Sequence, residues 1–229
     1  MIRNLVSTAM ILILMVGVPF LSFLTARRPE IRQIPRIDLY LSAVVSQWLL
    51  VALAIPALWL AGPGFGPMGF RSTTSSHFMT WAAALIGISL ALMGLEITLE
   101  HFALWPEESE LVHLLIPETR DEKLMAAWVV APTAAFCEEL LYRGFLFTVL
   151  SRWLDSVHWA MLLAAVAFGL AHVYQGARGI VRTALLGALL TIPVMRLGSL
   201  YPSMVAHCVI DAVALAWLGP RFFPPKRDN

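Results

Sequence analysis

Charged residues are scarce in this sequence. Asp, Glu, Lys and Arg make up 14% of the 229 residues, whereas 59% are hydrophobic and the mean hydropathy is +0.76. A soluble globular domain carries about 25% charged residues, so the composition excludes that class and indicates a membrane protein. The 16 Lys and Arg residues nearly balance the 15 Asp and Glu residues. No basic surface is therefore available for nucleic acid, which excludes nucleic-acid binding.

Cysteine and two common hydrolase motifs are also rare or missing. The two cysteines, Cys137 and Cys208, lie inside apolar segments, so no disulfide framework is indicated and each is interpreted as a small packing residue. The sequence contains neither HExxH, the compact zinc signature, nor GxSxG, the nucleophile elbow of serine hydrolases. No internal repeat or low-complexity tract occurs.

Long apolar runs, by contrast, are abundant. A spanning helix needs roughly 20 mostly apolar residues, and seven segments meet or approach this length. They are 5–24, 39–60, 78–99, 124–150, 157–174, 180–197 and 200–218. The first is interpreted as an uncleaved helix rather than a signal peptide. The sixth is the weakest, because Arg182 and Arg196 lie at its ends. The predicted fold is an all-α, polytopic membrane helix bundle with about seven transmembrane helices.

The chain is predicted to form one integrated membrane domain with three parts. Residues 1–123 form an N-terminal three-helix portion that ends in an acidic connector, residues 124–218 form the core, and residues 219–229 form a short polar tail. Seven spans place the two termini on opposite sides of the membrane. Because Lys and Arg favour the cytoplasmic side, their distribution among the connectors predicts a cytoplasmic C-terminus.

Three charged residues interrupt the fourth apolar segment. Glu138, Glu139 and Arg143 follow Cys137 closely, although a charged side chain in mid-membrane costs at least about 2.5 kcal/mol. Residues four apart share a helix face, so Arg143 is predicted to pair with Glu139, whereas Glu138 points about 100° away and is free to face a cavity. A purely structural ion-pair network between helices is the alternative.

Two later segments carry histidines in a similar setting. Phe168 and His172 share one helix face, and so do His207 and Asp211. Each pair alone is equally compatible with interhelical hydrogen bonding. However, polar groups on three separate spans must all avoid lipid, so we expect them to face one another. Carboxylates, imidazoles and a guanidinium in one dry pocket provide a base for water and donors for an oxyanion, which are the requirements of amide hydrolysis.

Taken together, these motifs resemble the CPBP (Abi) intramembrane proteases, which include the Rce1-like type II CAAX prenyl endopeptidases. The family pattern is EExxxR on one helix, FxxxH on the next, and HxxxN or HxxxD on a later one. It is matched here by Glu138, Glu139 and Arg143, by Phe168 and His172, and by His207 and Asp211. The resemblance spans roughly residues 124–218, whereas the first three spans match only in being apolar.

The resemblance implies an intramembrane endopeptidase in which Glu138 and His172 activate the attacking water. His207 and Asp211 would bind the oxyanion, with Glu139, Arg143 and Phe168 in support. Asp211 stands where CAAX proteases often have asparagine, so it either is protonated in a dry pocket or orients His207. The implied partners are the lipid bilayer and a membrane-associated peptide or protein, prenylated or not, and the implied location is a prokaryotic plasma (inner) membrane.

Two questions stay open at this level. The family is often described as metalloproteases, and His172, His207 and Glu138 would be the ligands if zinc or another divalent metal is present. A mechanism without metal fits the same residues and is preferred, so no cofactor is expected. A proton-coupled transporter, with the same residues as a relay, and a non-catalytic immunity or partner-binding protein are the alternative functions.

Overall fold

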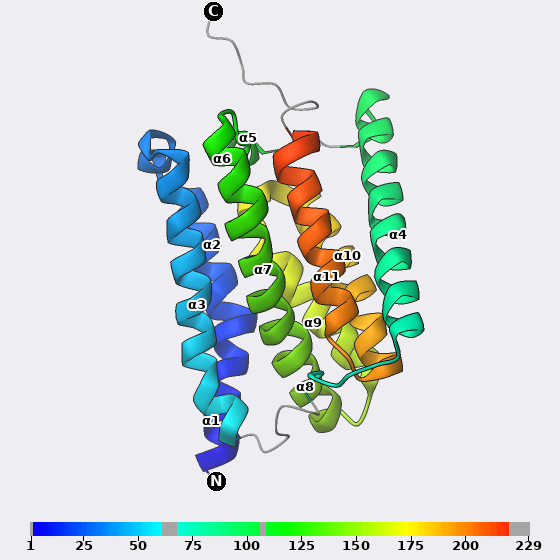
Figure 1. The fold of residues 1–229 in the computed structure, drawn as a ribbon. Coiled ribbons are helices and arrows are strands. Elements are labelled where there is room, and N and C mark those ends of the chain that lie inside the picture. The colour runs from blue at the N-terminus through cyan, green and yellow to red at the C-terminus, as the bar shows by residue number, and fades with distance from the viewer. Residues whose placement is uncertain (1, 61–67, 106–108, 220–229) are drawn as a thin grey trace, which may run out of the picture.

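The computed structural model describes residues 2–60, 68–105 and 109–219, and these residues form helices without any strand (Figure 1). The all-α prediction is confirmed. Within these ranges, six helices are long and apolar enough to cross a membrane, and one further apolar helix is shorter. The predicted bundle of about seven helices therefore comprises six long members and one short member. Of the predicted polar tail, only Gly219 lies within the described residues.

The N-terminal portion contains the first three long helices. The first is continuous through α1 (Ile2–Leu12), η1 (Ile13–Gly17) and α2 (Val18–Ala26). A 3₁₀ turn, η2 (Pro29–Gln33), leads into α3 (Arg36–Leu60), and α4 (Ser75–His101) follows. The side chain of Thr74 caps α4 by accepting a hydrogen bond from the backbone of His77, as expected for threonine at this position.

The second half of the chain contains the central helix and its partners. A short helix, α5 (Glu110–Leu115), precedes the long continuous helix α6 (Arg120–Met125), η3 (Ala126–Val130), α7 (Ala131–Glu138), η4 (Glu139–Phe147) and α8 (Thr148–Trp153). The remaining elements are α9 (Val157–Ala171), η5 (Val173–Gln175), α10 (Gly176–Leu197), α11 (Tyr201–Ala212) and η6 (Val213–Leu218). The sixth predicted span is not the weakest, because α10 has 22 residues and α9 only 15.

Two of the π-helical segments occur directly before a proline. η1 precedes Pro19 and η3 precedes Pro132, each the second residue of the helix that follows. Proline lacks a backbone N–H, and its ring clashes with the carbonyl four residues earlier. The wider π turn moves that carbonyl away, so each helix continues without a break.

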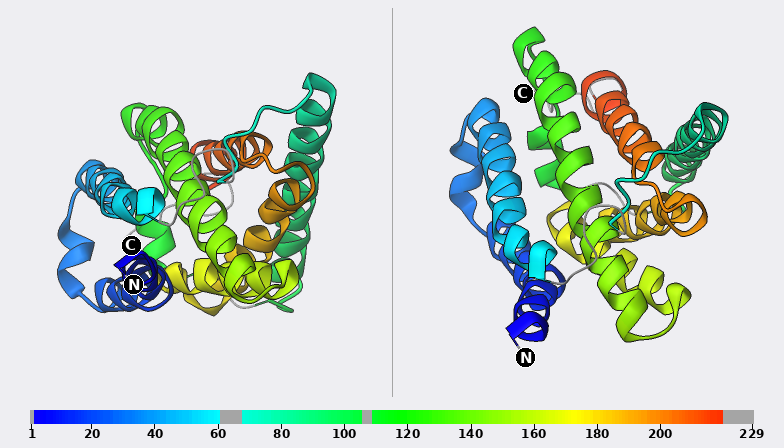
Figure 2. Two further views of the ribbon diagram at one scale, coloured as in Figure 1. Left: turned by 90° about the horizontal axis from the view of Figure 1, so that it is seen from below. Right: turned by 60° about the horizontal axis from the view of Figure 1, so that its bottom comes forward.

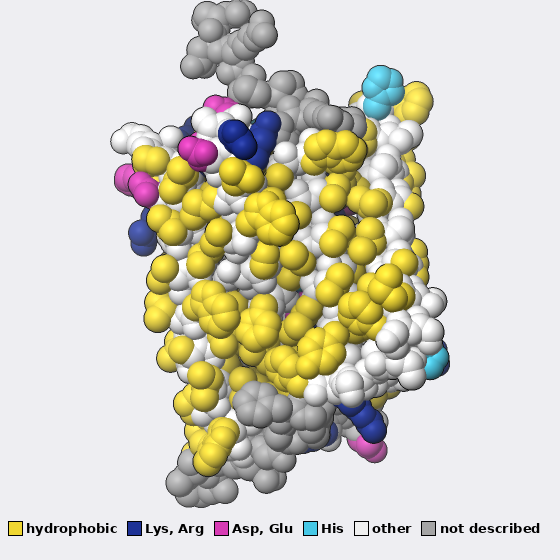
Figure 3. All heavy atoms as spheres, viewed as in Figure 1, with side chains coloured by type: hydrophobic (Ala, Val, Ile, Leu, Met, Phe, Trp, Pro, Cys, Tyr) yellow, Lys and Arg dark blue, Asp and Glu magenta, His cyan; other side chains and the backbone are white. Residues whose placement is uncertain are grey.

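The surface of the bundle is that of a protein embedded in lipid. Even in the most buried long helix, only 44% of the most apolar window is buried inside the protein. Hydrophobic side chains cover the middle of the face seen in Figure 3, whereas the visible Lys, Arg, Asp and Glu side chains gather toward its two ends. Exposed apolar surface of this extent is unfavourable in water. Together with the long apolar helices it identifies an integral membrane protein.

The core lies around the central helix, which has the most buried window of the six. Every residue of η4 is buried. Behind it, α9 packs tightly on α10 (Figure 2): a Cβ atom at Gly169 would lie only 2.6 Å from the carbonyl oxygen of Ile180. Only glycine allows this close crossing, which fixes the end of α9 beside α10.

The acidic connector is attached to the start of α3. The Arg36 side chain donates to the carbonyl oxygen of Leu114 at 2.8 Å and pairs with Glu118 at 2.5 Å. The Tyr40 hydroxyl donates to the carbonyl oxygen of Leu115 at 2.7 Å. These contacts hold α5 across one end of the bundle, next to the cavity described below. Glu107 and Glu108 of the predicted connector lie outside the described residues.

Candidate active site

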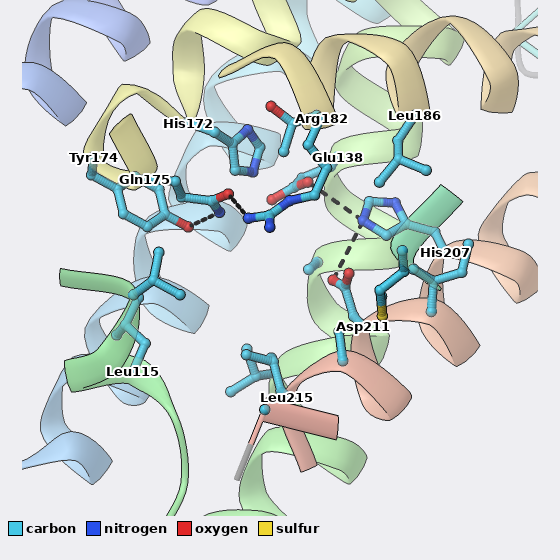
Figure 4. A pocket seen from close by; sticks show the side chains of 18 of the residues that line it. Leu115, Glu138, His172, Tyr174, Gln175, Arg182, Leu186, His207, Asp211 and Leu215 are labelled. Atoms are coloured by element: carbon cyan, nitrogen blue, oxygen red, sulfur yellow. Dashed lines mark hydrogen bonds and ion pairs between the residues drawn. The ribbon is translucent and has the colours of Figure 1, made fainter. Parts of the chain in front are cut away.

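A cavity of about 290 Å³ lies inside the bundle, and most of the polar residues singled out in the sequence line it. Glu138, Phe168, His172, His207 and Asp211 all contribute to its wall. They come from α7, the end of α9, and α11. Figure 4 shows the two imidazoles and the Glu138 carboxylate on the same cavity. The expectation that polar groups on separate helices face one another is therefore confirmed.

Glu138 is the last residue of α7, at the transition to the π-helical segment η4. Its Oε1 atom accepts a hydrogen bond of 2.7 Å from Nε2 of Gln47 on α3. Its Oε2 atom lies 3.7 Å from Nε2 of His207. One carboxylate oxygen is thus held by an amide, while the other faces the imidazole side of the cavity.

Glu139 forms the predicted pair with Arg143. Arg143 NH1 lies 3.1 Å from Glu139 Oε1, and the two side chains are 1% and 0% exposed. The guanidinium also lies over the Phe168 ring, 4.3 Å from its centroid, in cation–π geometry. Glu139 also has a second partner beyond the predicted one: its Oε1 atom lies 2.9 Å from Nδ1 of His207. The pair therefore supports an imidazole as well as balancing its own charge.

His172 follows α9 directly and caps its C-terminal end. Its Nδ1 atom lies 2.8 Å from the carbonyl oxygen of Phe168. A carbonyl oxygen only accepts, so Nδ1 carries the proton and the neutral ring keeps an unprotonated Nε2. The rings of Phe168 and His172 stack edge to face at 4.7 Å. The helix end thus presents an imidazole nitrogen that can accept a proton or a hydrogen bond.

His207 and Asp211 share one face of α11, as their spacing predicts. His207 Nε2 lies 3.4 Å from Asp211 Oδ2. Phe168 also packs against His207, with ring centroids 6.2 Å apart. Because Phe168 contacts Arg143, His172 and His207, it acts as the packing centre of the site.

The helix that leads to His172 is short. The predicted span 157–174 ends earlier in the structure, because α9 stops at Ala171 after 15 residues, about 22 Å at 1.5 Å per residue. The chain then turns through η5 and Gly176, whose φ of 79° favours glycine. His172 therefore lies at a helix end, where it lines the cavity together with residues of α7 and α11.

Comparison with known proteins identifies the segment that holds this site. Residues 120–213 match the model of a family described as type II CAAX prenyl endopeptidase, Rce1-like. The chain carries an Rce1-like segment. That segment covers less than half of the chain, yet it contains α7, α9 and α11 with all the predicted site residues. The predicted family is confirmed there, and at the level of the family the match supports a peptidase of the intramembrane CAAX protease type.

A curated relative is less informative. The uncharacterized protein YyaK of Bacillus subtilis (strain 168) is 28% identical over 144 residues, which is 60% of this chain and 45% of the relative. The alignment thus spans about half the length of the curated relative. No solved structure matches the chain.

The predicted alternative ligand set was His172, His207 and Glu138. Among the residues that the structure describes, no group of three or more His, Cys, Asp or Glu side chains has the spacing of a metal site. The Nε2 atom of His207, which faces the cavity, instead lies 3.4 Å from Asp211 Oδ2. These residues therefore do not fit a zinc site as they stand, and no step of the mechanism below is routed through a metal.

Several polar residues of the cavity are not among the predicted site residues. Gln47 was overlooked, although a lone amide in an apolar span is the same kind of signal as a lone charge. Arg178 and Arg182, which also lie in the Rce1-like segment, line the same cavity as Glu138. Arg178 NH1 is 2.7 Å from Glu100 Oε2, and Arg182 donates to Gln175 at 2.8 Å. Two arginines four residues apart in an apolar helix share one face, and this spacing could have indicated that both face the interior of the bundle.

Proposed function

We propose that the protein is an intramembrane endopeptidase that hydrolyses a peptide bond in a membrane-associated substrate. The observation that carries the proposal is the shared cavity of Glu138, His172 and His207, which three helices of the Rce1-like segment bring together. A base and a hydrogen-bond donor that face the same space are what addition of water to an amide requires.

Glu138 and His172 activate the water in this mechanism. The free Oε2 of Glu138 takes one proton, and the unprotonated Nε2 of His172 accepts a hydrogen bond from the other and fixes its position. The water oxygen attacks the carbonyl carbon, and the carbonyl becomes an oxyanion. When the C–N bond breaks, Glu138 returns the proton to the leaving nitrogen. The products are a carboxyl group and an amine.

His207 stabilises the oxyanion. A doubly protonated ring donates from Nδ1 to Glu139, as the 2.9 Å distance supports, and from Nε2 into the cavity. Asp211, 3.4 Å from Nε2, orients this nitrogen before the substrate arrives. The carboxylates of Glu139 and Asp211 offset the positive charge of the ring. Asp211 is thus proposed to orient His207, not to donate to the oxyanion itself.

The substrate class follows from the family and the setting. The cavity wall includes apolar side chains such as Leu115, Leu186 and Leu215 (Figure 4), and the helices around it face lipid. A peptide anchored in the membrane, including one with a prenyl group near its C-terminus, can reach such a site without leaving the bilayer.

We also propose that the protein lies in a prokaryotic plasma membrane with its C-terminus in the cytoplasm. The orientation is the one that the distribution of Lys and Arg among the connectors predicts.

The proposal is tested by His172→Ala. Purified protein is reconstituted in liposomes with two sets of peptides, one prenylated with a free C-terminus and one tethered by a single apolar helix. We expect wild type to cleave members of one set, and His172→Ala to lower kcat by about 10²-fold, because the attacking water is no longer held in position. The matched control is His158→Ala, since His158 lies exposed near the start of the helix that His172 caps and its loss leaves cleavage unchanged.

Three results would contradict the proposal. Equal cleavage by wild type and His172→Ala places the chemistry elsewhere. Proton-coupled solute flux without cleavage of either peptide set would favour the transporter. Binding of a peptide without any cleavage would favour the non-catalytic alternative.

Removal of metal gives a separate prediction. We expect the cleavage rate after dialysis against a strong chelator to equal the rate before it, because the proposed reaction uses Glu138 and His172 directly. Metal analysis of the dialysed protein is the control for complete removal. Loss of activity on chelation, restored by zinc, would instead support the ligand set His172, His207 and Glu138.

A further inference from the structure

One residue outside the Rce1-like segment makes a direct bond to the proposed base. Gln47 lies on α3, whereas the family match begins at residue 120. Leu39, Ala43 and Gln47 all line the cavity, and their spacing of four places them on one face of α3. The second long helix of the N-terminal portion is thus a wall of the site, and the Gln47 amide lies on that wall.

The hydrogen bond has a defined direction. The Nε2 of Gln47 donates to Oε1 of Glu138 at 2.7 Å, since an amide nitrogen only donates and a carboxylate oxygen only accepts. Hydrogen bonds to a charged acceptor are shorter and stronger than neutral ones. The bond occupies Oε1 and leaves Oε2, the atom facing His207, to receive the proton of the water.

The position of Gln47 is fixed by its neighbours. Trp48, the next residue, stacks on Phe136 of α7 with ring centroids 5.5 Å apart and planes at 27°. Phe136 is two residues before Glu138, so α3 and α7 are packed together at the level of the carboxylate. Gln47 lies 11 residues after the start of α3, about 17 Å along the helix axis. Of the polar atoms of this amide, Nε2 is bonded to Glu138, whereas the buried Oε1 has no hydrogen-bond partner.

We propose that Gln47 is a positioning residue that orients the Glu138 carboxylate for attack by water. This inference rests on the proposed role of Glu138 as base. Gln47 does not touch the reacting atoms; it fixes the rotation of the carboxylate so that Oε2 faces the cavity. The N-terminal helices therefore complete the site instead of only anchoring it.

The test compares Gln47→Met with wild type. Methionine keeps the length and volume of glutamine but cannot donate. We expect kcat to fall about 10- to 100-fold, the range of one hydrogen bond to a charged group, with KM unchanged. Ser46→Ala is the matched control, because Ser46 is the adjacent residue, is exposed and bonds only within its own helix. Its kcat should equal that of wild type.

A second pair of variants, made in the Glu138→Gln background, distinguishes a positioning role of Gln47 from a purely structural role. In the Glu138→Gln background, adding Gln47→Met should lower the residual rate no further, because Gln47 acts through the carboxylate. A purely structural role would instead lower the rate and the melting temperature in both backgrounds. Gln47→Asn, which keeps an amide but is one methylene too short to reach, provides a polar variant should Gln47→Met fold poorly, and it should lose kcat equally.

The outcomes distinguish this inference from the proposed function. One outcome contradicts the positioning role alone: wild type cleaves, Glu138→Gln does not, and both Gln47 variants cleave at the wild-type rate. The proposed protease function is then still supported. If wild type and Glu138→Gln behave alike, the proposed function itself fails.

Discussion

The Glu138→Gln variant is expected to lose about 10⁴-fold in kcat, the upper end for a residue that acts as base and then as acid, and to keep the wild-type fold. Glutamine has the same shape but cannot accept a proton from water. Gln47, the bonded neighbour, can rotate its amide and bond the new side chain through oxygen. The substitution therefore removes the proton acceptor and changes the packing of the side chain little.

The measurement is cleavage of the liposome-tethered peptides, with the melting temperature in micelles recorded for each variant. Wild-type melting together with absent cleavage supports the prediction. A variant that still cleaves within tenfold of wild type would show that another group takes the proton.

The Arg143→Met variant is expected to lower the free energy of unfolding by about 3 kcal/mol or more, because removing one partner of a buried ion pair leaves an uncompensated charge. Glu139 is 0% exposed, and Arg143 NH1 lies 3.1 Å from its Oε1. The cation–π contact with Phe168 is lost as well. Phe168 packs on both imidazoles, so cleavage should decline together with stability.

Arg32→Met is the matched control. Arg32 pairs with Glu110 at 2.6 Å, yet the two side chains are 63% and 65% exposed, and exposed pairs contribute about 1 kcal/mol or less. Denaturant unfolding in micelles compares the two variants. Equal, small effects would mean that water or lipid headgroups reach Glu139.

A third variant distinguishes the two roles of the pair. When Glu139→Gln is combined with Arg143→Met, the pair leaves no buried charge unbalanced, so much of the lost stability should return. Activity should stay low, because the substituted amide no longer carries the negative charge that Glu139 presents to Nδ1 of His207. Recovery of both properties would mean that Glu139 has no part in holding His207.

The sequence determined the class, the helices and the chemistry-bearing residues of this protein. Scarce charge and long apolar runs require lipid as the solvent, and helices are then the way to satisfy the backbone of separate spans. Spacing of four predicted the Glu139–Arg143 and His207–Asp211 contacts, because such contacts lie within one helix. The cost of polar groups in lipid predicted that the three motifs would face one another.

Contacts between helices were decided only by the tertiary structure. Which amide would reach Glu138, and that Glu139 would hold His207, depend on the rotation and depth of α3, α7 and α11 relative to one another. Side-chain packing between helices sets them, as where Trp48 of α3 stacks on Phe136 of α7, and no periodicity within a single helix encodes such contacts. The sequence by itself therefore determined which residues carry the chemistry, while packing decided which atoms meet.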